Sequence, residues 1–169
     1  MNLTIEKARP EDAAEILDFL KLIGGETDNL TFGAEGMPFT AQAEAEYIKS
    51  LENSCDGVML IAKNDGRIIG SASLNRLPRR MSHRGDFSVA VVREYWNCGV
   101  GGKLLNAIVD FARENSFEII ELQVRSDNLS AIRLYEKHGF QKICTYPSFF
   151  KIGNEFYDAD YMSLVIAKD

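Results

Sequence analysis

Alternating apolar and polar residues mark the strands that we expect in this chain. LTIEKAR at 3–9 alternates in this way, and GVMLIAK at 57–63 and RIIGSASLNRL at 67–77 flank the turn signal Asn64-Asp65-Gly66. Four more strands are expected in DFSVAVV at 86–92, FEIIELQV at 117–124, FQKICTYPSFF at 140–150 and YMSLVIA at 161–167.

Apolar residues at helical spacing predict the helices. The first opens at Pro10 and ends at Gly24 and Gly25, and the second begins after its cap, Thr40. The third begins near Gly101 and buries the stripe Leu104, Leu105, Ile108, Val109 and Ala112. The fourth occupies NLSAIRLYEKH at 128–138.

The elements therefore follow the order β-α-α-β-β-β-α-β-α-β-β. This order predicts an α/β sandwich around a mixed sheet, antiparallel in its early strands and parallel across the central β-α-β crossover. No repeat or linker interrupts residues 1–169, so we expect a single domain.

Charge and cysteine content narrow the class of protein. A net charge of -6 and a pI near 5.0 argue against a nucleic-acid-binding protein, which needs a basic patch. Cys55, Cys98 and Cys144 lack metal-site spacing, and the chain has only 2 histidines, so we expect no metal. Early acidic residues and the lack of a long apolar run favour a cytoplasmic protein without a membrane segment.

The stretch WNCGVGGKLL at 96–105 places three glycines between an expected strand and helix. Bare backbone at a helix N-terminus suits a phosphate or pyrophosphate group, although a tight turn with close helix packing also requires glycine. The spacing matches neither the Walker loop nor the dinucleotide-binding fingerprint, so nucleotide hydrolysis and hydride transfer lose support.

Two motifs in the second half of the chain decide between these alternatives. SVAVVREYWNCGVGGKLL and LQVRSDNLSAIRLYEKHGF resemble the two central motifs of the GNAT superfamily of N-acetyltransferases. The resemblance implies a GNAT-like three-layer fold with about four helices and acetyl-CoA as co-substrate. Trp96 departs from the pattern, because it stands where the family usually has Arg or Gln, and its ring could pack the loop instead.

The resemblance also implies roles for individual residues. Val89 and Val91 offer main-chain partners to the pantetheine arm, Asn128 and Ser130 hold the same arm, and Tyr135 reaches the sulfur. Tyrosine is a plausible acid for the departing thiolate. The glycine loop wraps the pyrophosphate, chiefly through main-chain N–H groups, with Asn97, Cys98, Gly99, Val100, Gly101, Gly102 and Lys103.

The general base and the acceptor site are open at this stage. Gln123 occupies the place of a glutamate found in some members of the family, so Glu121 and Asp86 are the candidate bases, and each also fits an ordinary exposed or ion-paired carboxylate. The connection at 24–39 either binds the acceptor amine or is a solvated loop. The residues expected to bind the amine are Glu26, Asp28, Phe32 and Glu35.

We expect an N-acetyltransferase that moves an acetyl group directly from acetyl-CoA to a primary amine of a small molecule or peptide. The first alternative is an acyl-CoA-binding regulatory module without turnover, and the second is a nucleotide-dependent oxidoreductase. No nucleic acid is expected as a partner. Aromatic residues within YPSFFKIGNEFYDADYMSL at 146–164 make a homodimer a reasonable expectation.

Overall fold

The structure, a computed structural model, describes residues 2–166, so Ala167 at the end of the last expected strand lies outside it. A seven-stranded sheet has the order β1-β2-β3-β4-β5-β7-β6. In the described part of the chain β4 and β5 pair in parallel, and the other neighbouring strands pair antiparallel. The strands are β1 (Leu3–Lys7), β2 (Gly57–Asn64), β3 (Arg67–Arg76), β4 (Arg84–Val91), β5 (Ile119–Arg125), β6 (Gln141–Ile152) and β7 (Glu155–Val165).

Four α-helices complete the fold, and their positions in the chain confirm the expected order and the mixed α/β class. No helix within residues 2–166 is both long and apolar enough to span a membrane. The helices are α1 (Ala13–Glu26), α2 (Ala41–Leu51), α3 (Val100–Glu114) and α4 (Leu129–Lys137).

The first helix differs from the prediction at both ends. Pro10 opens a short 3-10 turn rather than the helix, and α1 continues past Gly24 to Glu26. A Cβ on Gly24 would lie only 2.0 Å from the main-chain oxygen of Gly33. The glycine therefore allows the connection after α1 to pack against the helix, and it does not end the helix.

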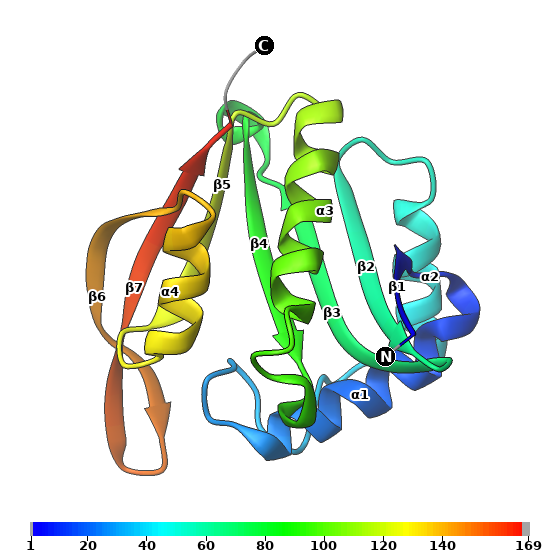
Figure 1. The fold of residues 1–169 in the computed structure, drawn as a ribbon, viewed down its shortest axis with the longest axis horizontal. Helices are drawn as coiled ribbons and strands as arrows, with labels where there is room; N and C mark the ends of the chain where they lie inside the picture. The colour runs from blue at the N-terminus through cyan, green and yellow to red at the C-terminus, as the bar shows by residue number, and fades with distance from the viewer. Residues whose placement is uncertain (1, 167–169) are drawn as a thin grey trace.

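The helices cover the two faces of the sheet in pairs (Figure 1), with α3 and α4 on the near face. The larger core lies between α3 and the sheet, where Leu104, Leu105 and Ile108 are completely buried. A second core on the opposite face joins Ile16 and Ile23 of α1 to α2 and the sheet. Burial of these two apolar helix faces is the main favourable contribution to the three-layer arrangement.

The sheet opens between β4 and β5. Their parallel pairing is limited to Arg84–Asp86 beside Ile119–Glu121. Beyond these residues the strands diverge, and the connection between α1 and α2 passes below their separated ends (Figure 1). The opening leaves main-chain groups of β4 without a strand partner, so an extended ligand can bind along this edge.

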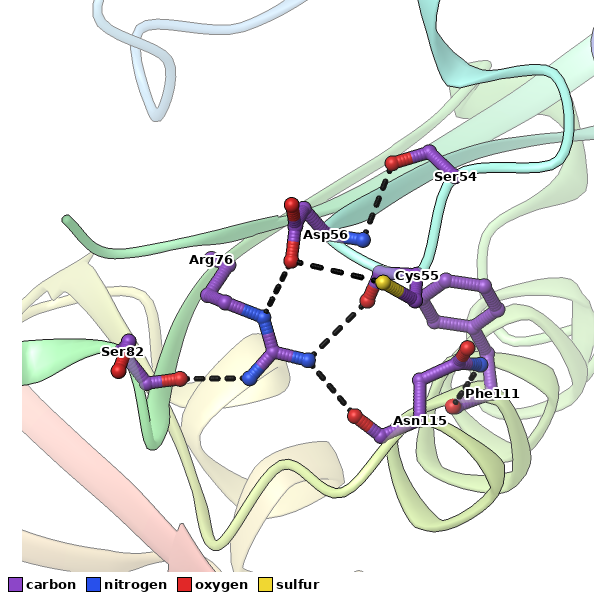
Figure 2. A network of polar contacts seen from close by, with 7 residues as sticks. All are labelled: Ser54, Cys55, Asp56, Arg76, Ser82, Phe111 and Asn115. Carbon is purple, nitrogen blue, oxygen red and sulfur yellow. Dashed lines mark hydrogen bonds and ion pairs between the residues drawn. The ribbon is translucent and has the colours of Figure 1, made fainter.

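At the closed end of this opening, the guanidinium of Arg76 joins several segments (Figure 2). It donates to the Asp56 carboxylate at 2.8 Å and to the main-chain oxygens of Ser82, Cys55 and Asn115 at 2.5, 3.1 and 2.7 Å. The group also lies 3.9 Å from the centre of the Phe117 ring. Arg76 of β3 thereby binds three segments: the one between α2 and β2, the one between β3 and β4, and the one that follows α3.

Candidate active site

The loop before α3 presents main-chain donors at a helix N-terminus. Gly99 caps α3 in the left-handed conformation, with φ of 82°, which glycine adopts without strain. The N–H groups of Val100, Gly101 and Gly102 have no main-chain acceptor among residues 2–166, as expected for the first turn of a helix. Together with the positive end of the helix dipole they form a site for an anion such as a pyrophosphate.

The main-chain N–H of Lys103, unlike those of the three residues before it, is not free to bind an anion. Its N–H donates to the Gly99 oxygen at 3.1 Å, so the main chain of Lys103 is committed to the helix. Any contact of Lys103 with an anion would therefore come from its side chain.

Trp96 packs the loop, as expected for an aromatic residue at this position. Its indole Nε1 donates to the main-chain oxygen of Val91 at 2.7 Å, and the Arg93 guanidinium lies 5.5 Å from its ring centre. Asn97 follows with a positive φ of 61°, and the N–H of Cys98 donates to Tyr95 at 3.3 Å. The loop is thus held to β4 without a charged residue at position 96.

The main chain of β4 offers partners toward the opening. Arg84 and Val92 direct their main-chain groups to the β3 side, where they bond to Leu77 and Ile69. Because successive residues of a strand alternate in direction, Val89 and Val91 point theirs toward β5. The oxygen of Val91 is already bonded to Trp96, so Val91 has only its N–H to offer, whereas Val89 has both groups.

Asn128 and Tyr135 lie on α4, which borders the opening. Asn128 caps this helix, since its side-chain oxygen accepts from the Ala131 N–H at 3.3 Å. Tyr135 is 7% exposed and packs edge-on against Phe87, with ring centres 6.3 Å apart. Its hydroxyl has no hydrogen-bond partner in the described part of the chain, and burial raises the pKa of Tyr135 well above its usual value. The phenol therefore remains protonated at neutral pH.

One cavity of about 1120 Å³ connects the glycine loop with the connection between α1 and α2. Cys98 and Lys103 are not among its lining residues. The residues expected to bind the cofactor that line it are Val89, Val91, Asn97, Gly99, Val100, Gly101, Gly102, Asn128, Ser130 and Tyr135. A mostly apolar cavity with a few convergent polar groups is typical of a small-molecule site.

The two candidate bases have different environments. Glu121 is buried, forms an ion pair with Arg84 and accepts a hydrogen bond from the Tyr161 hydroxyl, and it does not line the cavity. Asp86 lines the cavity, and its carboxylate has no hydrogen bond or ion pair with residues 2–166. Desolvation, together with the negative charge of Glu121, raises the pKa of Asp86. Asp86 is therefore the better placed of the two to exchange a proton with a ligand.

Most of the acidic residues expected at the acceptor site bind elsewhere. Glu26 accepts from the main-chain N–H of Arg93 at 2.8 Å, and Glu35 accepts from that of Gly33 at 2.8 Å. Asp28 contributes its main-chain oxygen to Arg125 at 3.2 Å. None of the three lines the cavity, whereas Phe32 does. Two of these carboxylates thus accept hydrogen bonds from main-chain N–H groups, Glu35 from a residue two positions away and Glu26 from one 67 positions away.

The structure adds one acidic residue that the sequence prediction missed. Glu44 of α2 lines the cavity and is only 5% exposed. The sequence carried a signal for it, because Glu44 lies four residues before Ile48, on the face that α2 buries. Tyr47, one turn later, also lines the cavity and donates to the Asn75 side chain at 2.9 Å.

No group of three or more His, Cys, Asp or Glu side chains in residues 2–166 is arranged to hold a metal ion. All three cysteines are free and exposed. The titratable and polar groups that line the cavity include the carboxylates of Asp86 and Glu44, the buried phenol of Tyr135 and main-chain donors.

Comparison with known proteins identifies similar chains. A model of the acetyltransferase (GNAT) family matches residues 28–140. The L-amino acid N-acetyltransferase AaaT of Escherichia coli is 34% identical over 63% of this chain and 67% of that protein. The N-alpha-acetyltransferase RimI of Mycobacterium tuberculosis is 34% identical over 48% of this chain and 51% of that protein. The matched segments thus span about half to two thirds of these relatives.

Two solved structures are similar in fold to this protein over nearly the whole chain. A GNAT acetyltransferase from Streptococcus pneumoniae has a TM-score of 0.94 at 29% identity, covering 98% of this chain and 99% of that one. The yncA protein of Salmonella typhimurium, solved with its cofactor acetyl-CoA, has a TM-score of 0.86 at 20% identity, covering 100% and 96%. The second likeness concerns the fold alone.

Proposed function

The chain belongs to the acetyltransferase (GNAT) family, and from this premise we propose that it transfers the acetyl group of acetyl-CoA directly to a primary amine. The observation that carries the proposal is one cavity whose lining includes the N-terminal glycines of α3, Tyr135 and Asp86. It provides a place for a pyrophosphate at one end and proton-transfer groups further along.

In this proposal the acetyl-CoA supplies an activated thioester, and the chain binds it mainly through backbone. The free N–H groups of Val100, Gly101 and Gly102 hold the pyrophosphate, and the main chain of Val89 holds the pantetheine arm. Asn128 has its amide nitrogen left for the same arm, because its oxygen already caps α4. The side chains of Ser130 and Asn97 line this half of the cavity.

Asp86 and Tyr135 divide the proton transfers. Asp86 accepts a proton from the acceptor ammonium, which frees the nitrogen lone pair to attack the acetyl carbonyl. As the bond from carbon to sulfur breaks, the hydroxyl of Tyr135 gives its proton to the departing sulfur. The attached nitrogen loses its second proton as the amide forms, and this proton returns through solvent to the Tyr135 phenolate, so that the acceptor ammonium has released one net proton, held by Asp86. The raised pKa of Tyr135 keeps this proton in place until negative charge develops nearby. No covalent acyl-enzyme forms, so the exposed cysteines are dispensable for the reaction.

The experiment measures CoA release from acetyl-CoA with polyamines, aminoglycosides, amino acids and N-terminal peptides as acceptors. Tyr135→Phe should lower kcat by roughly 10²-fold or more, the usual contribution of a general acid, while acetyl-CoA binding is unchanged. The phenyl ring keeps the edge-on contact with Phe87, so we expect the fold to be preserved and a loss of activity to report on the missing hydroxyl. Wild-type rates in the mutant would contradict the role of Tyr135.

The same variant separates the enzyme from a regulatory acyl-CoA-binding module. A module that only senses acyl-CoA would bind it in wild type and Tyr135→Phe alike and would release no CoA with any amine. The candidate acceptors to test include L-amino acids, which the name of AaaT mentions, and alpha-amino groups, which the name of RimI mentions.

Three wider expectations belong to the proposal. Residues 1–169 act as one acetyltransferase domain, and three free exposed cysteines suit the reducing cytoplasm. Two copies associate through β6, whose edge position leaves Ile143 and Tyr146 each 60% exposed. Sedimentation analysis distinguishes this homodimer from a monomer.

A further inference from the structure

Glu44 is an anomaly in the apolar interface between α2 and the sheet. It is 5% exposed, yet its carboxylate makes no hydrogen bond or ion pair with the described residues, and burial alone raises its pKa. Its oxygens still reach the cavity, but a charge largely removed from solvent and left without a partner is costly, and natural proteins normally pair such groups. Since Glu44 lines the cavity, a bound ligand is the partner available to it.

The acidic and the basic side chains that line the cavity lie on different elements. Four lining residues are charged: Glu44, Asp86, Arg133 and Lys137. The two cations lie on α4, whose end carries His138, the neighbour that a Cβ on Gly102 would meet at 3.6 Å. The cations thus belong to the helix that adjoins the anion site. The two acids lie on α2 and β4, toward the end where an acceptor would enter.

Within residues 2–166, the lining of the acceptor half therefore includes carboxylates but no cationic side chain. Arg84 is bonded to Glu121, and Arg125 is bonded to Asp127 and lies 3.9 Å from the centre of the Tyr157 ring. A carboxylate beside the reacting amine would meet two acids and only neutral polar groups such as Ser71 and Ser73, which is unfavourable in a partly desolvated cavity. Apolar side chains that could contact a carbon chain complete this half: Leu30, Phe32, Met59 and Phe149.

We infer that Glu44 is a specificity-determining residue that binds a cationic group of the acceptor, and that the acceptor is a small organic amine without a carboxylate beside its amino group. The inference rests on the proposed acetyl transfer and narrows its substrate class. It favours aliphatic and arylalkyl amines or diamines over free amino acids and other anionic acceptors. Asp86 keeps its role as the proton acceptor.

The test compares amines with the amino acids from which they differ only by a carboxylate. The pairs are phenethylamine with phenylalanine and cadaverine with lysine, and phenylalaninamide serves as a neutral group of similar size. Wild type should prefer each amine by about 10- to 100-fold in kcat/KM, the effect of one hydrogen bond to a charged group. Phenylalaninamide should resemble phenethylamine, because charge rather than size decides.

Glu44→Gln keeps the shape of the side chain and removes the charge. It should reduce the preference for amines to within about threefold, mainly through a higher KM for the amines, since a lost charged contact weakens binding. The melting temperature should stay equal or rise, because an unpartnered charge has left the interior. Glu46→Gln is the matched control, because Glu46 lies on the same helix but is exposed.

Each outcome decides a different question. An unchanged preference in Glu44→Gln, or a wild type that acetylates phenylalanine as well as phenethylamine, would overturn the inference while acetyl transfer stands. A drop in melting temperature with unchanged preference would assign Glu44 a purely structural role. Absence of CoA release with every acceptor, despite acetyl-CoA binding, would reject the proposed function itself.

Discussion

At the scale of single residues, Asp86 and Glu121 illustrate how neighbouring carboxylates acquire different roles. They are register partners on β4 and β5. Glu121 is neutralised by Arg84, whereas Asp86 faces the cavity and feels the charge of Glu121. Periodicity placed Glu121 and Gln123 on one face of the strand, but it could not predict the Arg84 partner, which lies 37 residues away.

Asp86→Asn tests the proton acceptor through the pH profile. The proposed reaction requires an ionised Asp86, so wild-type kcat/KM should fall as pH decreases through the raised pKa of this group. Asp86→Asn should lower kcat by roughly 10²-fold and abolish this acid limb, because asparagine cannot accept the proton. The measurement is kcat/KM from pH 5 to 9 with one amine at saturating acetyl-CoA.

Glu121→Gln is the companion variant. Removing its negative charge should lower the pKa of Asp86 and move the acid limb to lower pH without abolishing it. Circular dichroism checks that the loss of the partner of Arg84 leaves the fold intact. An unaltered limb in Asp86→Asn would assign the proton transfer to another group.

At the scale of elements, the three glycines at the start of α3 serve different purposes. Gly99 is required by its φ of 82°, and a Cβ on Gly101 would lie 3.2 Å from Leu134 of α4. A Cβ on Gly102 would meet nothing closer than 3.6 Å. Folding therefore demands glycine at the first position and favours it at the second, while the third is open to a ligand.

Gly102→Ala separates a phosphate cradle from a plain tight turn. Alanine inside a helix should stabilise the fold by about 0.5–1 kcal/mol relative to glycine. If the cradle holds a pyrophosphate, the added methyl group should nevertheless raise the KM for acetyl-CoA about tenfold or more. Gly99→Ala, in contrast, should lose about 1–2 kcal/mol of stability, because alanine is strained at positive φ. Chemical denaturation and steady-state kinetics measure both quantities.

Local patterns predicted the order of the elements because each strand and helix carries its periodicity within its own residues. These local patterns gave wrong predictions where the role of a residue depends on contact with a segment far away in the sequence. Gly24 suggested the end of α1, yet it makes room for Gly33, and Glu26 bonds to Arg93, 67 residues away. The same limit explains the acceptor site. The sequence pattern favoured the acidic residues in and beside the connection after α1. Glu44 could be recognised as a candidate only once the structure showed that it lines the cavity.

At the scale of the whole molecule, Arg76 joins segments that are remote in sequence (Figure 2). Its side chain is 17% exposed, and its guanidinium bonds to four different residues. Arg76→Lys should reduce the free energy of unfolding by about 2–4 kcal/mol, because a lysine ammonium cannot reproduce the planar array of donors.

Arg113→Lys is the control for this prediction. Arg113 forms a 3.5 Å pair with Asp110 in which both side chains are more than half exposed. Exposed pairs contribute little, so the change should stay within about 0.5 kcal/mol. Equal effects of the two substitutions in urea denaturation would show that the Arg76 contacts do not stabilise the fold.

The direction of the main-chain groups at Val89 and in the glycine loop has a consequence for evolution. Every amino acid except proline carries the same N–H group, so the proposed backbone contact at Val89 would survive most substitutions there, whereas the glycine loop tolerates few. Glu44, which faces the proposed acceptor with its side chain, has no such protection. Descendants of this gene can therefore exchange one amine for another by single substitutions while inheriting the acetyl donor unchanged.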